Sequence, residues 1–327
     1  MKIGFLTSGG DCQALNAAMR GTAKYLYEKE KNKVEFYGFL DGYKGLIRGN
    51  YKKMKIDDFE DILNLGGSVI GNSRTPFKLI NEPDEEGRDK VKSMIDTYKK
   101  TGLDCLVVAG GNGSHKTANL LFEKGLNVVT LPKTIDNDLE GIDVSFGFQS
   151  AIDVATDYID KLHSTAKSHG RVFVVEVMGH KTGWLTLHAG IASNADIILI
   201  PEIPYDINAV VKDIEEKEKR GKKYIIIAAA EGIISKEESL LTKKELKKKR
   251  KEGGNLIAAE RLAKELEPYV DKEIRTASIG HIQRGGNPCA YDTVLATRLG
   301  VMAGELIEKA ITKEEVVWSM TAGSITE

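Results

Sequence analysis

The sequence predicts an α/β protein in which mostly parallel sheets are covered by helices on both faces. Its apolar segments, such as residues 104–109 and 224–230, are nearly continuous apolar runs rather than alternating ones. Such runs are typical of strands that are buried on both faces. They alternate along the chain with segments of helical character, as in α/β folds. Glycine-rich and polar residues repeatedly follow the runs, at the carboxyl edge where parallel sheets bind ligands.

The expected strands are, in chain order, residues 3–7, 34–39, 104–109, 127–131, 171–178, 195–200, 224–230, 276–279 and 316–318. The main helices are expected at residues 15–30, 89–99, 148–164, 206–219, 256–266 and 290–308. Residues 240–254 are rich in lysine and are expected to form an exposed loop or a helical hairpin.

The chain of 327 residues is long enough for two lobes. We expect the first lobe to contain residues 1–138 plus about 256–304. The second lobe is expected to contain residues 139–255 plus about 305–327. No Pro- or Ser-rich linker separates the two parts.

Composition excludes several classes of function. Lysine and arginine total 47 against 48 for aspartate and glutamate, so the net charge is −1, which argues against a general nucleic-acid or anionic-membrane binder. The three cysteines, Cys12, Cys105 and Cys289, form no Cys-x-x-Cys motif and are typical of reduced thiols. The start turns polar too soon for a signal peptide, and no apolar run is long enough to span a bilayer. We therefore expect a soluble cytoplasmic protein.

The segment most suggestive of chemistry is residues 132–138, with the sequence PKTIDND. It follows the expected strand 127–131, so Asp136 and Asp138 should project at the carboxyl edge of the sheet. One carboxylate could take a proton from a substrate hydroxyl while the other holds a metal ion. The alternative is an Asx-turn with two solvated carboxylates. The surrounding motifs favour the catalytic interpretation.

Three other strands are followed by glycines, at Gly9-Gly10, residues 110–114 and Gly285-Gly286. Such segments can present backbone N–H groups to an anion, although two glycines can also form a simple tight turn. Their spacing fits neither the dinucleotide fingerprint nor the Walker A loop, which disfavours a dinucleotide-dependent oxidoreductase. With the scattered arginines and the carboxylate pair, they indicate a sugar- or alcohol-phosphate kinase. These arginines are Arg74, Arg171, Arg275 and Arg284.

Several segments resemble, in the same order, motifs of the 6-phosphofructokinase family. They are residues 6–11 (LTSGGD) with Asn16-Ala17-Ala18, 110–114 (GGNGS), 132–138, 174–179 (VVEVMG) and 280–286 (GHIQRGG). The resemblance implies two similar three-layer lobes, the first binding the phosphate donor and the second fructose 6-phosphate. It implies phosphoryl transfer from Mg-ATP to the 1-hydroxyl of fructose 6-phosphate, in glycolysis. It also implies a homodimer or homotetramer.

The resemblance assigns roles to the donor side and the catalytic segment. Asp136 matches the base that deprotonates the sugar hydroxyl, and Asp138 a residue that assists at the magnesium site. Thr134 matches a residue near the transferred phosphoryl group. Gly10 matches a backbone contact to the terminal phosphates, and Arg74 an arginine that reaches the donor.

The sugar site is expected to be completed across a subunit interface. Arg171 and Arg275 match arginines that come from a neighbouring subunit to bind the sugar phosphate. A monomer should therefore be poorly active. The other expected sugar contacts are Met178, Gly179, Glu231, His281 and Arg284.

Asn112 and His180 are among the positions that depart from the family pattern. Asn112 stands where a magnesium-binding aspartate is usual, and an amide ligates a dication more weakly than a carboxylate. The expected metal ligands are Asn112 and Asp138. His180 replaces an arginine that usually stabilises the transferring phosphoryl group, and is expected to contact the substrate. A sugar-phosphate-binding paralogue with weak activity is therefore an alternative. Gly111 and Ser114, in the same segment as Asn112, are expected to contact the donor.

The choice of donor is expected to depend on Gly113 and Lys133. In the family, pyrophosphate enzymes carry Asp and Lys at these positions, and the Asp blocks the α-phosphate of a nucleotide. The Gly and Lys of this chain occur together in some ATP-dependent members, so ATP is the expected donor. Gly183-Trp184 resembles the pyrophosphate branch, which keeps pyrophosphate as the alternative.

Overall fold

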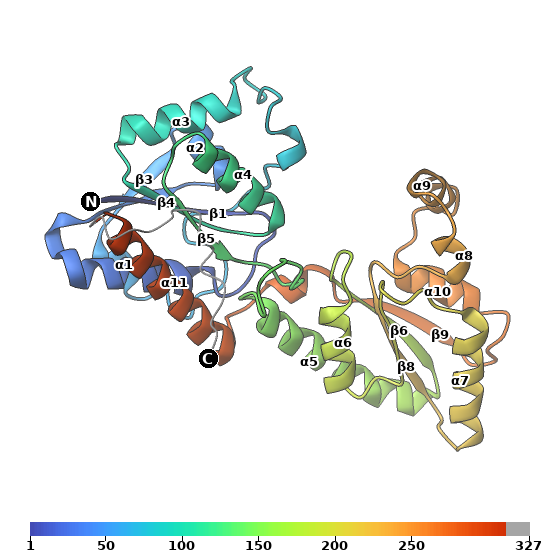
Figure 1. Ribbon diagram of the computed structural model, residues 1–327. Helices are drawn as coiled ribbons and strands as arrows, with labels where there is room; N and C mark the ends of the chain where they lie inside the picture. Colours follow the sequence, from blue (N-terminus) through green and yellow to red (C-terminus); the bar gives the residue numbers. More distant parts are fainter. Residues whose placement is uncertain (312–327) are drawn as a thin grey trace. The chain divides into compact units, whose positions relative to one another are not determined.

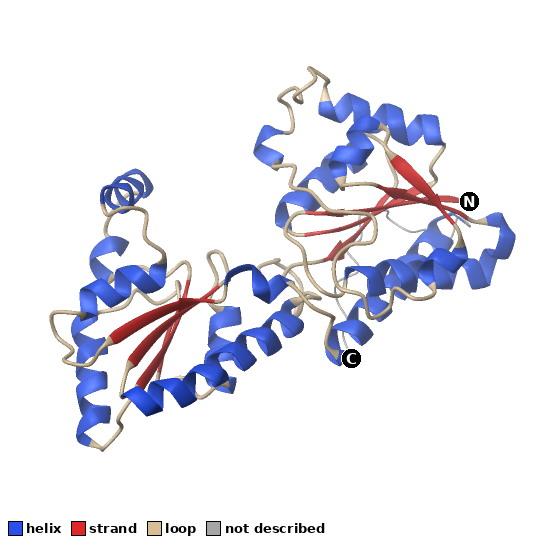
Figure 2. Cartoon of the chain, turned by 180° about the vertical axis from the view of Figure 1, so that it is seen from behind, coloured by secondary structure: helices blue, strands red, loops and turns tan. Residues whose placement is uncertain are grey.

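The computed structural model describes residues 1–311, which form two compact units, shown in Figure 1 and from behind in Figure 2. Of the described residues, unit 1 contains Met1–Ser150 and residues 284–311, and unit 2 contains Ala151–Gln283. The strand expected at residues 316–318 lies outside the described residues. The predicted α/β class with mostly parallel sheets is confirmed.

Unit 1 is built on a five-stranded sheet with the order β3-β2-β1-β4-β5. All neighbours pair in parallel except β3, which lies antiparallel to β2 at one edge. No local sequence pattern predicted this short, exposed strand. The strands are β1 (Lys2–Ser8), β2 (Glu35–Phe39), β3 (Tyr51–Met54), β4 (Cys105–Gly110) and β5 (Val128–Pro132).

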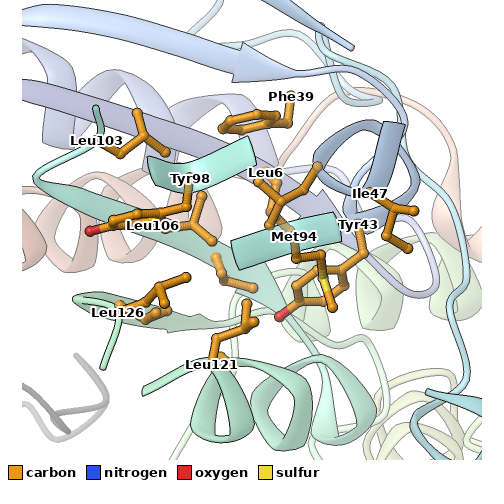
Figure 3. Close-up of a cluster of buried hydrophobic side chains, with 14 of the residues drawn as sticks. Leu6, Phe39, Tyr43, Ile47, Met94, Tyr98, Leu103, Leu106, Leu121 and Leu126 are labelled. Atoms are coloured by element: carbon orange, nitrogen blue, oxygen red, sulfur yellow. The ribbon is translucent and has the colours of Figure 1, made fainter. Parts of the chain in front are cut away.

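Helices cover both faces of this sheet (Figure 1). One face carries α2 (Tyr43–Arg48), α3 (Lys90–Thr101) and α4 (Asn112–Glu123). The other carries α1 (Leu15–Glu30) and α11 (Ala290–Ile311). Three short 3₁₀ helices complete unit 1: η1 (Lys31–Lys33), η2 (Ile56–Phe59) and η3 (Phe77–Leu79). Figure 3 shows the core on the α2–α4 face, where Leu6 and Leu106 of the sheet are buried with Tyr43, Met94 and Leu121 of the helices.

Unit 2 has a four-stranded, wholly parallel sheet with the order β7-β8-β6-β9. Side chains of α7 and α10 form its core with the sheet, and α5 and α6 lie on the other face (Figure 1). Its strands are β6 (Val172–Val177), β7 (Ile197–Leu199), β8 (Ile225–Ala230) and β9 (Ile274–Ser278). Its helices are α5 (Phe148–His169), which begins in unit 1, α6 (Trp184–Ala192), α7 (Ile207–Lys219), α8 (Lys236–Ser239), α9 (Lys243–Glu252) and α10 (Ala258–Leu266). The 3₁₀ helix η4 (Gly280–Arg284) ends at the first residue of the second segment of unit 1.

The compact units differ from the expected lobes in three segments. Residues 256–283 belong to unit 2, because β9 pairs with β6 and the Ala258 N–H donates to the buried Glu176 at 2.5 Å. Residues 139–150 belong to unit 1, where the Ser145 hydroxyl donates to the Thr134 carbonyl. Residues 305–311 also belong to unit 1, as the end of α11.

The lysine-rich residues 240–254 contain α9, a helix with no buried residue. Its first turn is capped by Thr242 and Glu245, each side chain binding the other residue's backbone N–H. This is the exposed polar surface that the composition predicts. No helix among residues 1–311 is both long and apolar enough to cross a membrane.

Candidate active site

The strand order of unit 1 places a topological switch point between β1 and β4, because the chain builds β2 and β3 on one side of β1 and β4 and β5 on the other. Ligands of open α/β sheets bind at the carboxyl edge beside such a point. Three strands end there in register, since Ser8 is paired with Gly110 and Gly110 with Pro132. The glycine turn, the start of α4 and residues 133–138 therefore leave the sheet side by side.

In the turn after β1, the backbone conformation favours glycine at one position, and an arginine side chain packs closely on the next. Gly9 has a φ of +92°, a region that favours glycine. A Cβ on Gly10 would lie 2.6 Å from Nη1 of Arg284. The Gly9 N–H donates to the Ser73 carbonyl at 3.0 Å, so the loop before Arg74 is joined to this turn. Arg74 itself is exposed and forms no ion pair with any residue in 1–311.

The start of α4 forms the second part of this edge. Gly111 is its N-cap without any side-chain hydrogen bond, and its first turn carries no acidic residue. Unoccupied N–H groups and the positive end of the helix dipole attract anions here. Asn112 and Gly113 are exposed, whereas Ser114 is buried and its carbonyl accepts a hydrogen bond from the Tyr43 hydroxyl at 2.8 Å. Four of the predicted donor contacts, Gly111 to Ser114, thus lie at the start of α4, whereas Gly10 and Arg74 lie outside this helix.

The catalytic segment after β5 is held by a local hydrogen-bond network. The Thr134 hydroxyl accepts from the Asp136 N–H at 3.1 Å and donates to Oδ1 of Asp138 at 3.2 Å. Asn137, at a φ of +51°, accepts from the Ser145 N–H at 2.9 Å. Both carboxylates are half-buried. The segment is an ordered loop rather than a pair of freely solvated aspartates.

Lys133 and Arg284 lie beside the glycine turn. The ammonium of the buried Lys133 donates to the Gly10 carbonyl, and Nη1 of Arg284 donates to the Asp11 carbonyl at 2.9 Å. Burial lowers the pKa of Lys133. Burial also raises the pKa of the Asp11 carboxyl, against the opposing effects of the Cys12 N–H and the two cations. Arg284 is predicted as a sugar contact, but within unit 1 it binds the glycine turn after β1.

A pocket of about 500 Å³ adjoins this edge. It is lined by Asn112, His115 and Lys116 of α4 and by residues 139–142, which follow Asp138. The two predicted magnesium ligands, Asn112 and Asp138, supply one amide and one carboxylate. Such a set suits Mg²⁺, which usually keeps several waters and is held by one or two carboxylates plus substrate phosphates. Among residues 1–311, no group of three or more His, Cys, Asp and Glu side chains could hold a metal ion.

The carboxyl edge of the unit 2 sheet collects several of the predicted sugar contacts. Oε1 of Glu231, after β8, accepts from the N–H groups of Gly179 at 3.2 Å and His180 at 2.6 Å, after β6. Met178 is the residue between β6 and Gly179, and His281 follows β9 in η4. The His180 side chain is exposed, and its φ is +53°. Glu231 therefore fixes the backbone that carries Gly179 and His180.

Arg171 and Arg275 lie at the opposite edge of the same sheet. Arg171 precedes β6, and Arg275 is paired with Phe173 near the start of that strand. Both arginines form ion pairs with Glu273. The six residues of β6 separate Arg171 from Met178, a distance of about 20 Å. The structure does not bring these two arginines to Met178 and Glu231 within one chain.

Comparison with known proteins shows to which family the chain belongs. The phosphofructokinase family model matches residues 2–307. The chain belongs to the phosphofructokinase family. A protein of Spirochaeta thermophila named ATP-dependent 6-phosphofructokinase is 51% identical over 308 residues, covering 93% of this chain and 84% of that protein. ATP-dependent 6-phosphofructokinase 3 of Bacteroides thetaiotaomicron is 43% identical, covering 94% and 85%.

A solved structure extends the similarity to the fold. The phosphofructokinase of Pichia pastoris in the T-state superposes with a TM-score of 0.76 at 32% identity, covering 94% of this chain. This chain spans only 32% of the length of that protein. The fold expected from the sequence motifs is confirmed.

Two contacts at these edges were not predicted from the sequence. Nδ2 of Asn72 donates to the Gly9 carbonyl at 2.9 Å, and Glu273 joins Arg171 to Arg275. Asn72 lies in the glycine-led loop before Arg74, which was of interest only for its arginine. The contacts of Asn72 with Gly9 and of Glu273 with Arg171 join segments 63 and 102 residues apart in sequence, so no local pattern reveals them.

Proposed function

We propose that this chain is an ATP-dependent 6-phosphofructokinase, which transfers the terminal phosphoryl group of ATP to the 1-hydroxyl of fructose 6-phosphate and gives fructose 1,6-bisphosphate in glycolysis. Family membership and the names of its relatives support the reaction and the donor. The observation that supports the mechanism is the position of Asp136, whose backbone N–H binds the Thr134 hydroxyl in the segment that leaves the sheet beside the glycine turn and the start of α4. A cytoplasmic location remains a prediction.

Asp136 is the proposed general base. It accepts the proton of the 1-hydroxyl as the sugar oxygen attacks the terminal phosphorus, while the bond to the leaving phosphate oxygen breaks. Phosphoryl transfer depends mainly on positioning and on stabilising charge at the transferred group. The hydrogen bond from the Asp136 N–H to the Thr134 hydroxyl keeps the base in place.

The donor phosphates would lie against backbone N–H groups. The Gly9-Gly10 turn and the first turn of α4 supply them, and Arg74 supplies an exposed cation without an ion pair in residues 1–311. Mg²⁺, bound with the phosphates, would neutralise their charge, with Asp138 and Asn112 as its protein ligands. Gly113 leaves space for a nucleotide, because a Cβ there would meet nothing within 4 Å.

The sugar would bind at the carboxyl edge of unit 2, against Met178, Gly179 and the carboxylate of Glu231. His281 is placed at the same edge by η4. His180 stands where the family usually has an arginine, and an imidazole offers fewer hydrogen-bond donors than a guanidinium group. We expect this substitution to reduce stabilisation of the transferring group without abolishing it.

We further propose that the active enzyme is a homodimer or homotetramer in which Arg171 and Arg275 bind the sugar phosphate of a neighbouring subunit. Their place at the opposite edge from Glu231 supports this, because one chain cannot bring the two sets together across β6. Their shared partner Glu273 would hold both guanidinium groups on one surface. Isologous contact between two such surfaces is the commonest symmetry in soluble oligomers.

The variant Asp136→Asn tests the mechanism. We expect kcat to fall by about 10²–10⁴-fold, because general base catalysis contributes this much. The affinity for fructose 6-phosphate, measured by calorimetry, should stay within about threefold, because the amide keeps the shape of the carboxyl group.

The matched control is Asp143→Asn, an exposed aspartate in the same loop. It should leave kcat unchanged. Turnover of Asp136→Asn close to that of the parent would show that another group is the base.

A further inference from the structure

Three consecutive carbonyl groups of the turn after β1 are each bound by a side chain from a different part of unit 1. Nδ2 of Asn72 donates to the Gly9 carbonyl at 2.9 Å. The ammonium of Lys133 donates to the Gly10 carbonyl. Nη1 of Arg284 donates to the Asp11 carbonyl at 2.9 Å. Loop 71–76, the segment after β5 and the segment before α11 thus hold the same three peptide units.

These contacts determine where the N–H groups of the turn point. In a planar trans peptide unit, the N–H lies opposite to the carbonyl of the preceding residue. Holding the Gly9 and Gly10 carbonyls therefore directs the N–H groups of Gly10 and Asp11 to the other side. Neither N–H has an acceptor among residues 1–311. The turn thus offers two unused N–H donors to an anion.

Lys133 is suited to this role rather than to direct contact with a ligand. Only 1% of its surface is exposed, and its ammonium binds the inner side of the turn. A Cβ on Gly9 would lie 3.5 Å from that ammonium, so turn and lysine are closely packed. A cation on a carbonyl polarises the peptide unit, which strengthens the N–H on its opposite side as a donor. It also places positive charge behind the anion site without occupying it.

We propose that Lys133 is a positioning residue, which together with Asn72 and Arg284 orients and polarises the Gly10 and Asp11 N–H groups toward the terminal phosphates of the donor. The proposal rests on the proposed function. Its consequence is that Lys133 strengthens binding of ATP and of pyrophosphate alike, because both present terminal phosphates to the turn. Discrimination between the two donors then depends on Gly113 and not on Lys133.

The test is the variant Lys133→Met, which keeps the length of the side chain and removes its charge and hydrogen bond. Dissociation constants for Mg-ATP and Mg-pyrophosphate are measured by calorimetry, which needs no turnover. Both should rise by about tenfold, as expected for loss of a charge-assisted hydrogen bond. Their ratio and the dissociation constant for fructose 6-phosphate should stay within about twofold. In active enzyme, KM for the donor should rise more than kcat falls.

Asn72→Ala is the second variant, for the case in which Lys133→Met does not fold. Asn72 is partly exposed. Loss of its side chain should raise the dissociation constants of both donors equally, by about threefold. In the double variant the two effects should not add, because both side chains hold one turn. Lys124→Met, at the exposed far end of α4, is the control and should bind both donors as the parent does.

Two results would overturn the proposal. If Lys133→Met weakened pyrophosphate alone, the lysine would be a direct contact to that donor. If neither variant changed the affinity for either donor, the three carbonyl contacts would have no role in binding. A parent protein that binds both donors without turnover would contradict the proposed function and leave this test intact.

Discussion

Gly113 is the residue that we propose to select the phosphate donor. It lies in the first turn of α4, and a Cβ there would meet no atom within 4 Å. A side chain at this position therefore enters open space beside the N–H groups of the helix rather than the core. Substitutions here should alter the ligand without disturbing the fold.

Gly113→Asp is expected to lower kcat/KM for ATP by about 10- to 100-fold, because the carboxylate would repel the α-phosphate. Use of pyrophosphate, where measurable, should change by less than about threefold. Initial rates with the two donors provide the measurement. Unchanged use of ATP would show that the nucleotide does not pass this position.

Local sequence patterns predicted the residues of the donor edge and the catalytic segment but not their contacts. Asp136 could be singled out because it follows an apolar strand and belongs to a family motif. The partner of Asn72 could not, because the Gly9 carbonyl is 63 residues away in sequence. For Lys133, the motif indicated a link to the donor, whereas the structure places its ammonium under the turn.

Helices α1 and α11 approach each other through glycines. A Cβ on Gly300 would lie 2.1 Å from the Ala18 carbonyl oxygen, and one on Gly21 would lie 2.5 Å from that of Thr297. The Thr22 hydroxyl donates to the Gly300 carbonyl at 2.9 Å. This close packing fixes α11 on unit 1, next to the turn that contacts Arg284.

Gly300→Ala should therefore lower the free energy of unfolding by about 1–3 kcal/mol, the usual cost of overpacking. The measurement is the midpoint of urea unfolding, with an unchanged slope. The control Gly113→Ala replaces a helical glycine with open space around it, and should raise stability by about 0.5–1 kcal/mol. Equal effects of the two substitutions would contradict the close contact.

Helix α10 and strand β9 show that local sequence can predict an element without predicting the unit to which it belongs. Both were expected as elements, yet they were assigned to the first lobe. Their place in unit 2 depends on the pairing of β9 with β6 and on Glu176, whose buried carboxyl accepts from the Ala258 N–H at the start of α10. Glu176 lies inside an apolar strand, and nothing in its neighbours indicates a partner 82 residues later.

For the whole molecule, the two edges of the unit 2 sheet have different proposed roles. One edge carries Met178 and Glu231, and the other carries Arg171 and Arg275 joined by Glu273. The resemblance to a family predicted that these arginines act on another subunit. Their location is what a shared site would require.

Mixing two inactive variants tests this arrangement. Asp136→Asn and Arg275→Ala should each be nearly inactive alone. After the chains are dissociated and reassembled together, half of the dimers are hybrids with one intact site, so activity should recover to about a quarter of the parent level. Recovery is measured as the rate with saturating substrates. No recovery, with hybrids shown to form, would mean that each site uses the arginine of its own chain.

The most direct test of the proposed function is the initial rate at which fructose 1,6-bisphosphate forms from fructose 6-phosphate in the presence of Mg²⁺. ATP and pyrophosphate are compared as donors. We expect turnover with ATP and a much lower kcat/KM with pyrophosphate. A higher kcat/KM with pyrophosphate would contradict the role given to Gly113. If the protein bound fructose 6-phosphate but showed no turnover with either donor, the proposed phosphotransferase activity would be contradicted. That result would favour a sugar-phosphate-binding protein.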